Sequence, residues 1–172
     1  MNAVQRREAL SRCLTETPCP VSATALAQRF SVSRQIIVGD IALLRAAGAN
    51  IVSTPRGYLV PREVGGRLRT LVCRHSAAEL EPELNIMVDN GCTVIDVAVE
   101  HPVYGQLSGQ LQVFSRYDAD VFWDALQKNG AQPLCSLTGD IHLHTLVCPD
   151  EARKARVLAA LEEKGYLMGL EQ

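Results

Sequence analysis

The sequence predicts an α+β protein of two domains: a small helical domain over residues 1–62, then an α/β sandwich domain over residues 63–172 with a mixed or antiparallel sheet. Apolar residues recur at helical spacing in the first part, whereas strand-like and helical segments alternate in the second. The stretch "PREVGGRL" separates the two patterns as a linker, and the net charge changes sign across it.

The opposite charges of the two domains indicate different partners. Residues 1–62 contain eight arginines, no lysine and three acids, whereas residues 63–172 contain nine bases and sixteen acids. A basic module joined to an acidic one is typical of a nucleic-acid-binding domain followed by a domain that does not touch nucleic acid. The chain shows no apolar run of about 18 residues and no signal peptide, so we expect a cytoplasmic protein without membrane contact.

The first domain is predicted to be a winged helix-turn-helix. An amphipathic helix is expected over Val4–Thr15, a second helix after the N-cap Ser22, and a third from the N-cap Ser33 to the stop at Gly48. A turn of about three residues joins the last two helices, which is the helix-turn-helix arrangement. The stretch "ANIVSTPRGYLVP" then predicts a hairpin that forms the wing.

The stretch "VSRQIIVGDIALLRAAGANIVSTPRGYLV" resembles the winged helix of bacterial repressors of metabolic genes. The resemblance implies that Ser33, Arg34 and Gln35 contact phosphates and base edges at the start of the recognition helix, and that Arg56 reaches DNA from the wing tip. Gly39 departs from the pattern, because relatives often carry a long polar residue there. The alternatives are that these arginines form a solvated face or that the domain docks a protein.

The second domain is expected to pack its helices on one face of the sheet. Strands are predicted over residues 67–74, 92–100, 105–114, 133–137 and 141–148, and helices over residues 77–91, 118–130 and 150–165.

The strand "IHLHTLVC" carries two of the four histidines of the chain. Because side chains alternate along a strand, His142 and His144 share one face. The other face carries Ile141, Leu143, Thr145 and Val147. We expect the apolar face to be buried and the opposite face to present the two imidazoles.

The stretch "RHSAAELEPEL" predicts a second pair of candidate ligands. Ser76 and Glu79 form a capping box, which starts a helix at residue 77 and leaves His75 just before its cap. On that helix Glu83 is the acid nearest the buried apolar stripe, on the side toward which His75 leans. A His75–Glu83 pair is therefore sterically reasonable.

Together the two pairs supply three imidazoles and one carboxylate from elements far apart in the sequence. Such a set suits zinc or nickel, whereas Mg²⁺ or Ca²⁺ would require more oxygen ligands. Taken singly, each residue also fits a structural role: a histidine bonded to a carbonyl group, a solvated acid, or an exposed polar strand face.

A winged helix followed by "CRHSAAELEPEL", "VEHPVYG" and "GDIHLHTL" resembles the NiaR family of niacin-responsive bacterial transcriptional repressors, whose second domain is called the three-histidine domain. The resemblance implies repression of niacin-uptake or NAD-biosynthesis genes, with nicotinic acid as co-repressor. It also implies one divalent transition metal per subunit, nickel or zinc, held by four residues: His75, Glu83, His142 and His144.

A pocket for nicotinic acid requires apolar walls and a cationic or metal anchor for the carboxylate. The metal is one candidate anchor, and Arg74 and Arg116 are candidate helpers. His101, at a predicted strand end beside a loop, is a further candidate for this pocket, with a structural histidine as the alternative.

A single winged helix reads only a few base pairs, so we expect a homodimer on a two-fold-related operator. The acidic second domain is the expected place for both the dimer contacts and the effector.

Two other functions remain open at this point. Three histidines and Glu83 also describe a zinc-dependent hydrolase fused to a DNA-binding domain, although no HExxH motif appears. A thiol-based redox regulator could use Cys73 or Cys148, neither of which has a resolving partner nearby in sequence.

Overall fold

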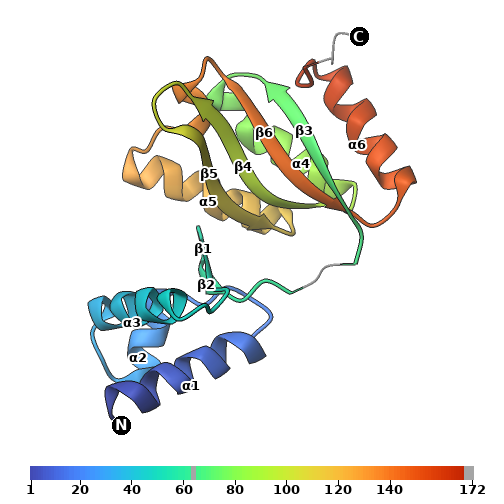
Figure 1. The fold of residues 1–172 in the computed structure, drawn as a ribbon. Helices are drawn as coiled ribbons and strands as arrows, with labels where there is room; N and C mark the ends of the chain where they lie inside the picture. Colours follow the sequence, from blue (N-terminus) through green and yellow to red (C-terminus); the bar gives the residue numbers. More distant parts are fainter. Residues whose placement is uncertain (63–64, 169–172) are drawn as a thin grey trace. The chain divides into compact units, whose positions relative to one another are not determined.

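A computed structural model describes residues 1–62 and 65–168 (Figure 1). The chain forms two compact units, Met1–Glu63 and Val64–Gln172. The domain boundary expected after residue 62 lies next to residues 63–64, which are outside the described residues. The same two residues form part of the expected linker, 61–68. Within the described part of the chain, no helix has the length and apolar character needed to cross a membrane.

The first unit has the expected helices and hairpin. Ser22 and Ser33 are both N-caps, because their side chains accept hydrogen bonds from the backbone N–H groups of Ala25 and Ile36. The elements are α1 (Ala3–Glu16), α2 (Ala23–Phe30), α3 (Arg34–Ala46), β1 (Val52–Thr54) and β2 (Gly57–Leu59).

A buried ion pair fixes α1 against α3 beneath the recognition surface. Arg6 donates to Asp40 with 2.6 Å between Nε and Oδ2, and Arg7 Nη1 lies 3.5 Å from Asp40 Oδ1. Asp40 is buried, so its two basic partners are needed to compensate its charge. The apolar core of this unit, which includes Leu10, Leu26, Ile37 and Ile41, lies between the three helices.

The wing is attached to the helices by a short strand pairing. Val21 and Tyr58 exchange two backbone hydrogen bonds of 2.9 Å. This close approach requires a glycine beside it: Gly57 has φ +132°, and a Cβ there would lie 2.3 Å from the Val21 carbonyl oxygen.

The second unit contains one antiparallel four-stranded sheet in the order β3-β6-β4-β5, so β6 is a central strand. Helices α4, α5 and α6 pack on one face of it, as expected, with α4 and α5 behind the sheet in Figure 1. The elements are β3 (Arg67–Arg74), η1 (Ala77–Glu79), α4 (Leu80–Asp89), β4 (Thr93–His101), β5 (Gly105–Val113), α5 (Arg116–Asn129), η2 (Leu134–Leu137), β6 (Ile141–Cys148) and α6 (Glu151–Glu163).

The strand expected over residues 133–137 is wrong. This segment is the 3₁₀-helix η2, with Ser136 N–H donating to Pro133 O and Thr138 N–H donating to Cys135 O. A short apolar run does not distinguish a strand from a helical turn, and here the local i→i+3 hydrogen bonds prevail.

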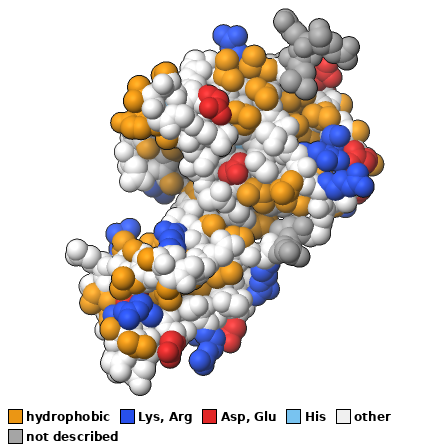
Figure 2. Space-filling model, in the orientation of Figure 1, with side chains coloured by type: hydrophobic (Ala, Val, Ile, Leu, Met, Phe, Trp, Pro, Cys, Tyr) orange, Lys and Arg blue, Asp and Glu red, His pale blue; other side chains and the backbone are white. Residues whose placement is uncertain are grey.

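The expected burial of the two faces of β6 is also wrong. His142 and His144 have no exposed surface because they face the helices, whereas Ile141 on the opposite side is 37% exposed. Of the four residues on that side only Val147 is buried. Figure 2 shows hydrophobic side chains among polar ones on the sheet face that the helices leave open. The histidine pair therefore belongs to the interior of the second unit.

Two glycine substitutions test this description of the first unit. We expect Gly57→Ala to lower its free energy of unfolding by about 1–3 kcal/mol, because the added Cβ meets Val21 and the φ angle is positive. Gly39→Ala should raise it by about 0.5–1 kcal/mol, since Gly39 lies inside α3 with open space around it. Urea unfolding followed by circular dichroism measures both changes.

The single tryptophan, Trp123, lies in α5 of the second unit, so its fluorescence transition is the internal control. A Gly57→Ala variant as stable as wild type would contradict the close approach of wing and helix.

Candidate functional site

The candidate site is a buried carboxylate on which three imidazoles converge. Glu83 Oε2 lies 2.8 Å from His75 Nε2, 3.2 Å from His142 Nε2 and 3.2 Å from His144 Nε2. Glu83, His142 and His144 have no exposed surface, and His75 is 7% exposed. The structure thus brings together the four residues that the sequence analysis named as candidate metal ligands.

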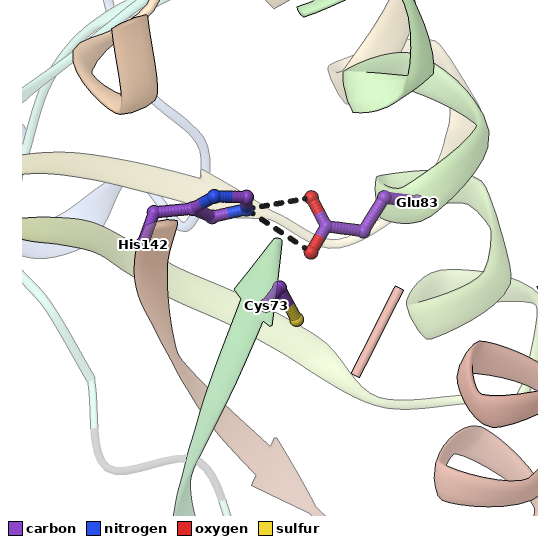
Figure 3. Close-up of side chains that lie close together, drawn as sticks. All are labelled: Cys73, Glu83 and His142. Carbon is purple, nitrogen blue, oxygen red and sulfur yellow. Dashed lines mark hydrogen bonds and ion pairs between the residues drawn. The ribbon is translucent and has the colours of Figure 1, made fainter. Parts of the chain in front are cut away.

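The fold positions these side chains through one strand register and one helix face. β6 pairs antiparallel with β3, and His142 lies opposite Cys73 in that ladder. α4 buries Leu84 and Met87 toward the sheet, and Glu83 lies on the same inner side. Figure 3 shows Glu83 reaching from α4 toward the imidazole of His142.

The second nitrogen of each ring is fixed by a backbone carbonyl group. His75 Nδ1 lies 3.0 Å from Ser76 O, His142 Nδ1 lies 3.0 Å from Asp140 O, and His144 Nδ1 lies 2.8 Å from Asp96 O. A carbonyl oxygen can only accept, so each Nδ1 carries a proton, and Nε2 is the ring nitrogen that faces Glu83. Metal-binding histidines are typically oriented by such a contact on their other nitrogen.

Lone pairs that face a carboxylate require a cation or protons between them. His75 Nε2 is buried and, among the described residues, meets no partner in hydrogen-bonding geometry despite its short distance to Glu83. Each ring nitrogen lies about 3 Å from the Glu83 oxygen, as expected of a histidine and a carboxylate that share a metal through bonds of about 2.0–2.2 Å. A set of imidazole nitrogens with one carboxylate suits zinc or nickel.

Without a metal, protons hold the cluster together. Burial opposes ionisation of Glu83, but the three imidazoles outweigh it and hold the pKa of the carboxyl well below its usual range. Burial also opposes charging of His75 and His144, yet the Glu83 charge raises the pKa of both rings. A divalent cation would replace these protons, as metals do when they bind histidine and carboxylate ligands.

Cys73 also belongs to this cluster, which the sequence analysis did not predict. Its Sγ, a carboxylate oxygen of Glu83 and a ring nitrogen of His142 all lie within 4.8 Å of one another (Figure 3). Burial, with the nearby Glu83 charge, raises the pKa of the Cys73 thiol strongly, so it is protonated in the metal-free protein. The sequence shows a Cys-x-His pattern at residues 73–75 and a His-x-His pattern at residues 142–144, but it does not show that the strands pair with Cys73 opposite His142.

Cys148 lies beside the thiol of Cys92, which is 56 residues away in the sequence. Its Sγ lies 3.1 Å from Cys92 Sγ, in the interior beside the end of β6. Burial raises the pKa of Cys92 to about 12, so little of the reactive thiolate forms at neutral pH. This environment disfavours a thiol-based redox regulator.

The three candidate effector residues do not form one site. His101 Nδ1 accepts hydrogen bonds from the N–H groups of Val103 and Tyr104 and so shapes the turn after β4. Arg116 binds Asp89 at the surface, and Arg74 is an exposed residue at the end of β3. In the described part of the chain, no hydrogen bond or ion pair joins any of them to the histidine cluster.

The candidate DNA surface lies at the start of α3 and on the wing. Ser33, Arg34 and Gln35 are exposed, whereas Arg56 is half-buried between β1 and β2. Figure 2 shows basic side chains on the first unit. Two apolar residues near the start of α3 are also exposed: Ile36 at 42% and Val38 at 39%.

Several arginines of the first unit are engaged inside it and do not face DNA freely. Besides Arg6 and Arg7, Arg45 donates to Ile51 O and Arg62 donates to Thr15 O. The net charge of this unit therefore overstates the basic surface available to a phosphate backbone.

Comparisons with known proteins agree with this arrangement. The family model described as "3H domain" matches residues 68–170, and the model described as "HTH domain" matches residues 6–59. The chain is 41% identical over 164 residues to "Probable transcription repressor NiaR" of Thermotoga maritima, covering 95% of this chain and 94% of that protein. The chain belongs to the NiaR family of transcription repressors.

A second relative supports the same assignment. "Transcription repressor NadR" of Bacillus subtilis is 40% identical over 167 residues, covering 95% of this chain and 93% of that protein. The expected resemblance to the NiaR family is thus confirmed, and with it a repressor that combines an HTH domain and a 3H domain. Because both relatives are named as transcription repressors, a regulator is favoured over the hydrolase.

Replacing Glu83 tests the metal assignment directly. We expect wild-type protein to retain about one zinc or nickel ion per chain, and Glu83→Gln to lose it because the neutral amide no longer balances the cation. Elemental analysis after gel filtration measures the content. Glu81→Gln, on the same helix and outside the cluster, is the matched control and should keep its metal; equal retention in both variants would contradict the site.

Proposed function

We propose that this protein is a metal-containing repressor that binds operator DNA in response to nicotinic acid and controls niacin-uptake or NAD-biosynthesis genes in the cytoplasm. The observation that carries the proposal is the convergence of His75, His142 and His144 on Glu83, each ring held by a carbonyl group at Nδ1. Membership of the NiaR family and its HTH domain support the regulatory part.

In this proposal His75, Glu83, His142 and His144 hold one nickel or zinc ion per subunit. When bound, the ion supplies a positive charge that can anchor the carboxylate or ring nitrogen of nicotinic acid. The residues of the chain orient the site: the carbonyl groups of Ser76, Asp140 and Asp96 fix the ring tautomers, and the helix layer excludes water.

The strand β6 offers a path from the site to the start of the second unit. It carries His142 and His144 and pairs with β3 along eight residue pairs, from Arg74 back to Arg67. At that end Gly66 packs so closely that a Cβ would lie 2.8 Å from Val147 Cγ1. We infer that β3 and β6 transmit a change at the metal site to the start of the second unit.

Repression requires two recognition helices on a two-fold operator, so we propose a homodimer formed through the second unit. Nicotinic acid changes DNA affinity only if it favours one arrangement of the two winged helices over the other.

The recognition helix is tested by two arginine variants. We expect Arg34→Ala to weaken operator binding by about 1–3 kcal/mol, because Arg34 is exposed at the start of α3. Arg12→Ala removes the same charge from an exposed position on α1 and should have a much smaller effect. Fluorescence anisotropy with an operator upstream of niacin-transport genes measures both, and equal losses would show that only overall charge matters.

The effector response is tested with the same operator and metal-loaded protein. We expect nicotinic acid to tighten DNA binding of the wild type but not of a His142→Ala/His144→Ala variant, because that variant lacks two of the proposed ligands. The Arg34→Ala variant is the control: its binding should be weaker throughout yet still respond to nicotinic acid. Wild-type binding that is indifferent to nicotinic acid would contradict the proposed effector.

A further inference from the structure

The cluster around Glu83 contains a sulfur donor besides the four proposed ligands. Cys73 lies opposite His142 in the antiparallel ladder of β3 and β6, and it has no exposed surface. Side chains of directly opposed residues stand on the same face of a sheet, about 4.5–5.5 Å apart at Cβ. Cys73 and His142 therefore point into the same space beneath α4, where Glu83 enters.

The spacing of the donor atoms supports a shared ligand role. The Cys73 sulfur, a Glu83 carboxylate oxygen and a His142 nitrogen all lie within 4.8 Å of one another. Small side-chain movements would bring all three onto one ion with bonds of about 2.0–2.3 Å. The buried His75 Nε2 faces the same space: it lies 2.8 Å from Glu83 Oε2 but outside hydrogen-bonding geometry, as two ligands of one cation would.

We propose that Cys73 Sγ is a further ligand of the metal, so that the site combines nitrogen, oxygen and sulfur donors. The inference rests on the metal site of the proposed function. On coordination the S–H bond breaks, its proton leaves to solvent and a metal–sulfur bond forms, with no change of oxidation state. A thiolate ligand favours zinc or nickel over the harder Mg²⁺ and Mn²⁺.

Cobalt(II) is a suitable probe, because a thiolate bound to Co²⁺ gives a charge-transfer absorption in the near ultraviolet that imidazole and carboxylate ligands do not give. Metal-free full-length protein is titrated with Co²⁺, and we expect the band to grow to saturation in the wild type. Cys73→Ser and Cys73→Ala should lose the band while His75, Glu83, His142 and His144 still retain cobalt.

Cys135→Ser is the matched control. Cys135 is also buried, and the Glu83 charge contributes to raising the pKa of its thiol, but it lies outside the donor cluster. This variant should keep the full band. A band that survives in both Cys73 variants, or that disappears in Cys135→Ser alone, would overturn the assignment of Cys73.

X-ray absorption of the zinc-loaded wild type provides a readout that needs no variant. We expect a sulfur scatterer at about 2.3 Å in addition to nitrogen and oxygen at about 2.0–2.1 Å. A shell of nitrogen and oxygen only would overturn the role of Cys73 and leave the four-residue site standing. Wild-type protein that binds neither zinc nor cobalt would instead overturn the proposed metal site itself.

Discussion

The buried charge of Glu83 is the constraint on which the second unit depends. An isolated carboxylate in a protein interior costs several kcal/mol, so its partners must be present when the helix packs on the sheet. Here the partners are three imidazoles from the end of β3 and from β6. A slip of one residue in the β3–β6 register would turn His142 and His144 to the open face and leave Glu83 uncompensated. The site and the fold therefore specify each other.

The first unit uses the same principle for a different purpose. Asp40 is a buried carboxylate whose partners, Arg6 and Arg7, come from α1, and this pair holds α1 against the recognition helix α3. Two guanidinium groups, which always carry a positive charge, balance Asp40, whereas the rings around Glu83 are held by carbonyl groups at Nδ1 and turn their Nε2 atoms inward. The first arrangement is complete as a structural element, and the second is suited to a cation from outside.

Local patterns in the sequence predicted much of this. The capping residues Ser22 and Ser33 and the position of Glu83 beside the apolar stripe follow from helical geometry, which a few neighbouring residues determine. Two features that the sequence did not predict depend on tertiary contacts: which face of β6 the helices cover, and the contact of Cys73 with Glu83 and His142. The helical turn at residues 134–137 was missed for a local reason, because a short apolar run does not distinguish a strand from a 3₁₀ turn. Alternation along β6 separated the two faces correctly, but alternation alone cannot say that the histidine face is the buried one.

The central claim is that one divalent cation lies among His75, Glu83, His142 and His144. The most direct measurement is an anomalous difference map from crystals of protein purified without chelator, collected on both sides of the zinc and nickel absorption edges. We expect one anomalous peak per chain, within about 2.0–2.2 Å of the three Nε2 atoms and of a Glu83 carboxylate oxygen. A map without such a peak, from crystals soaked in either metal, would contradict this claim, and the cluster would then be a network of histidine side chains around a buried carboxylate.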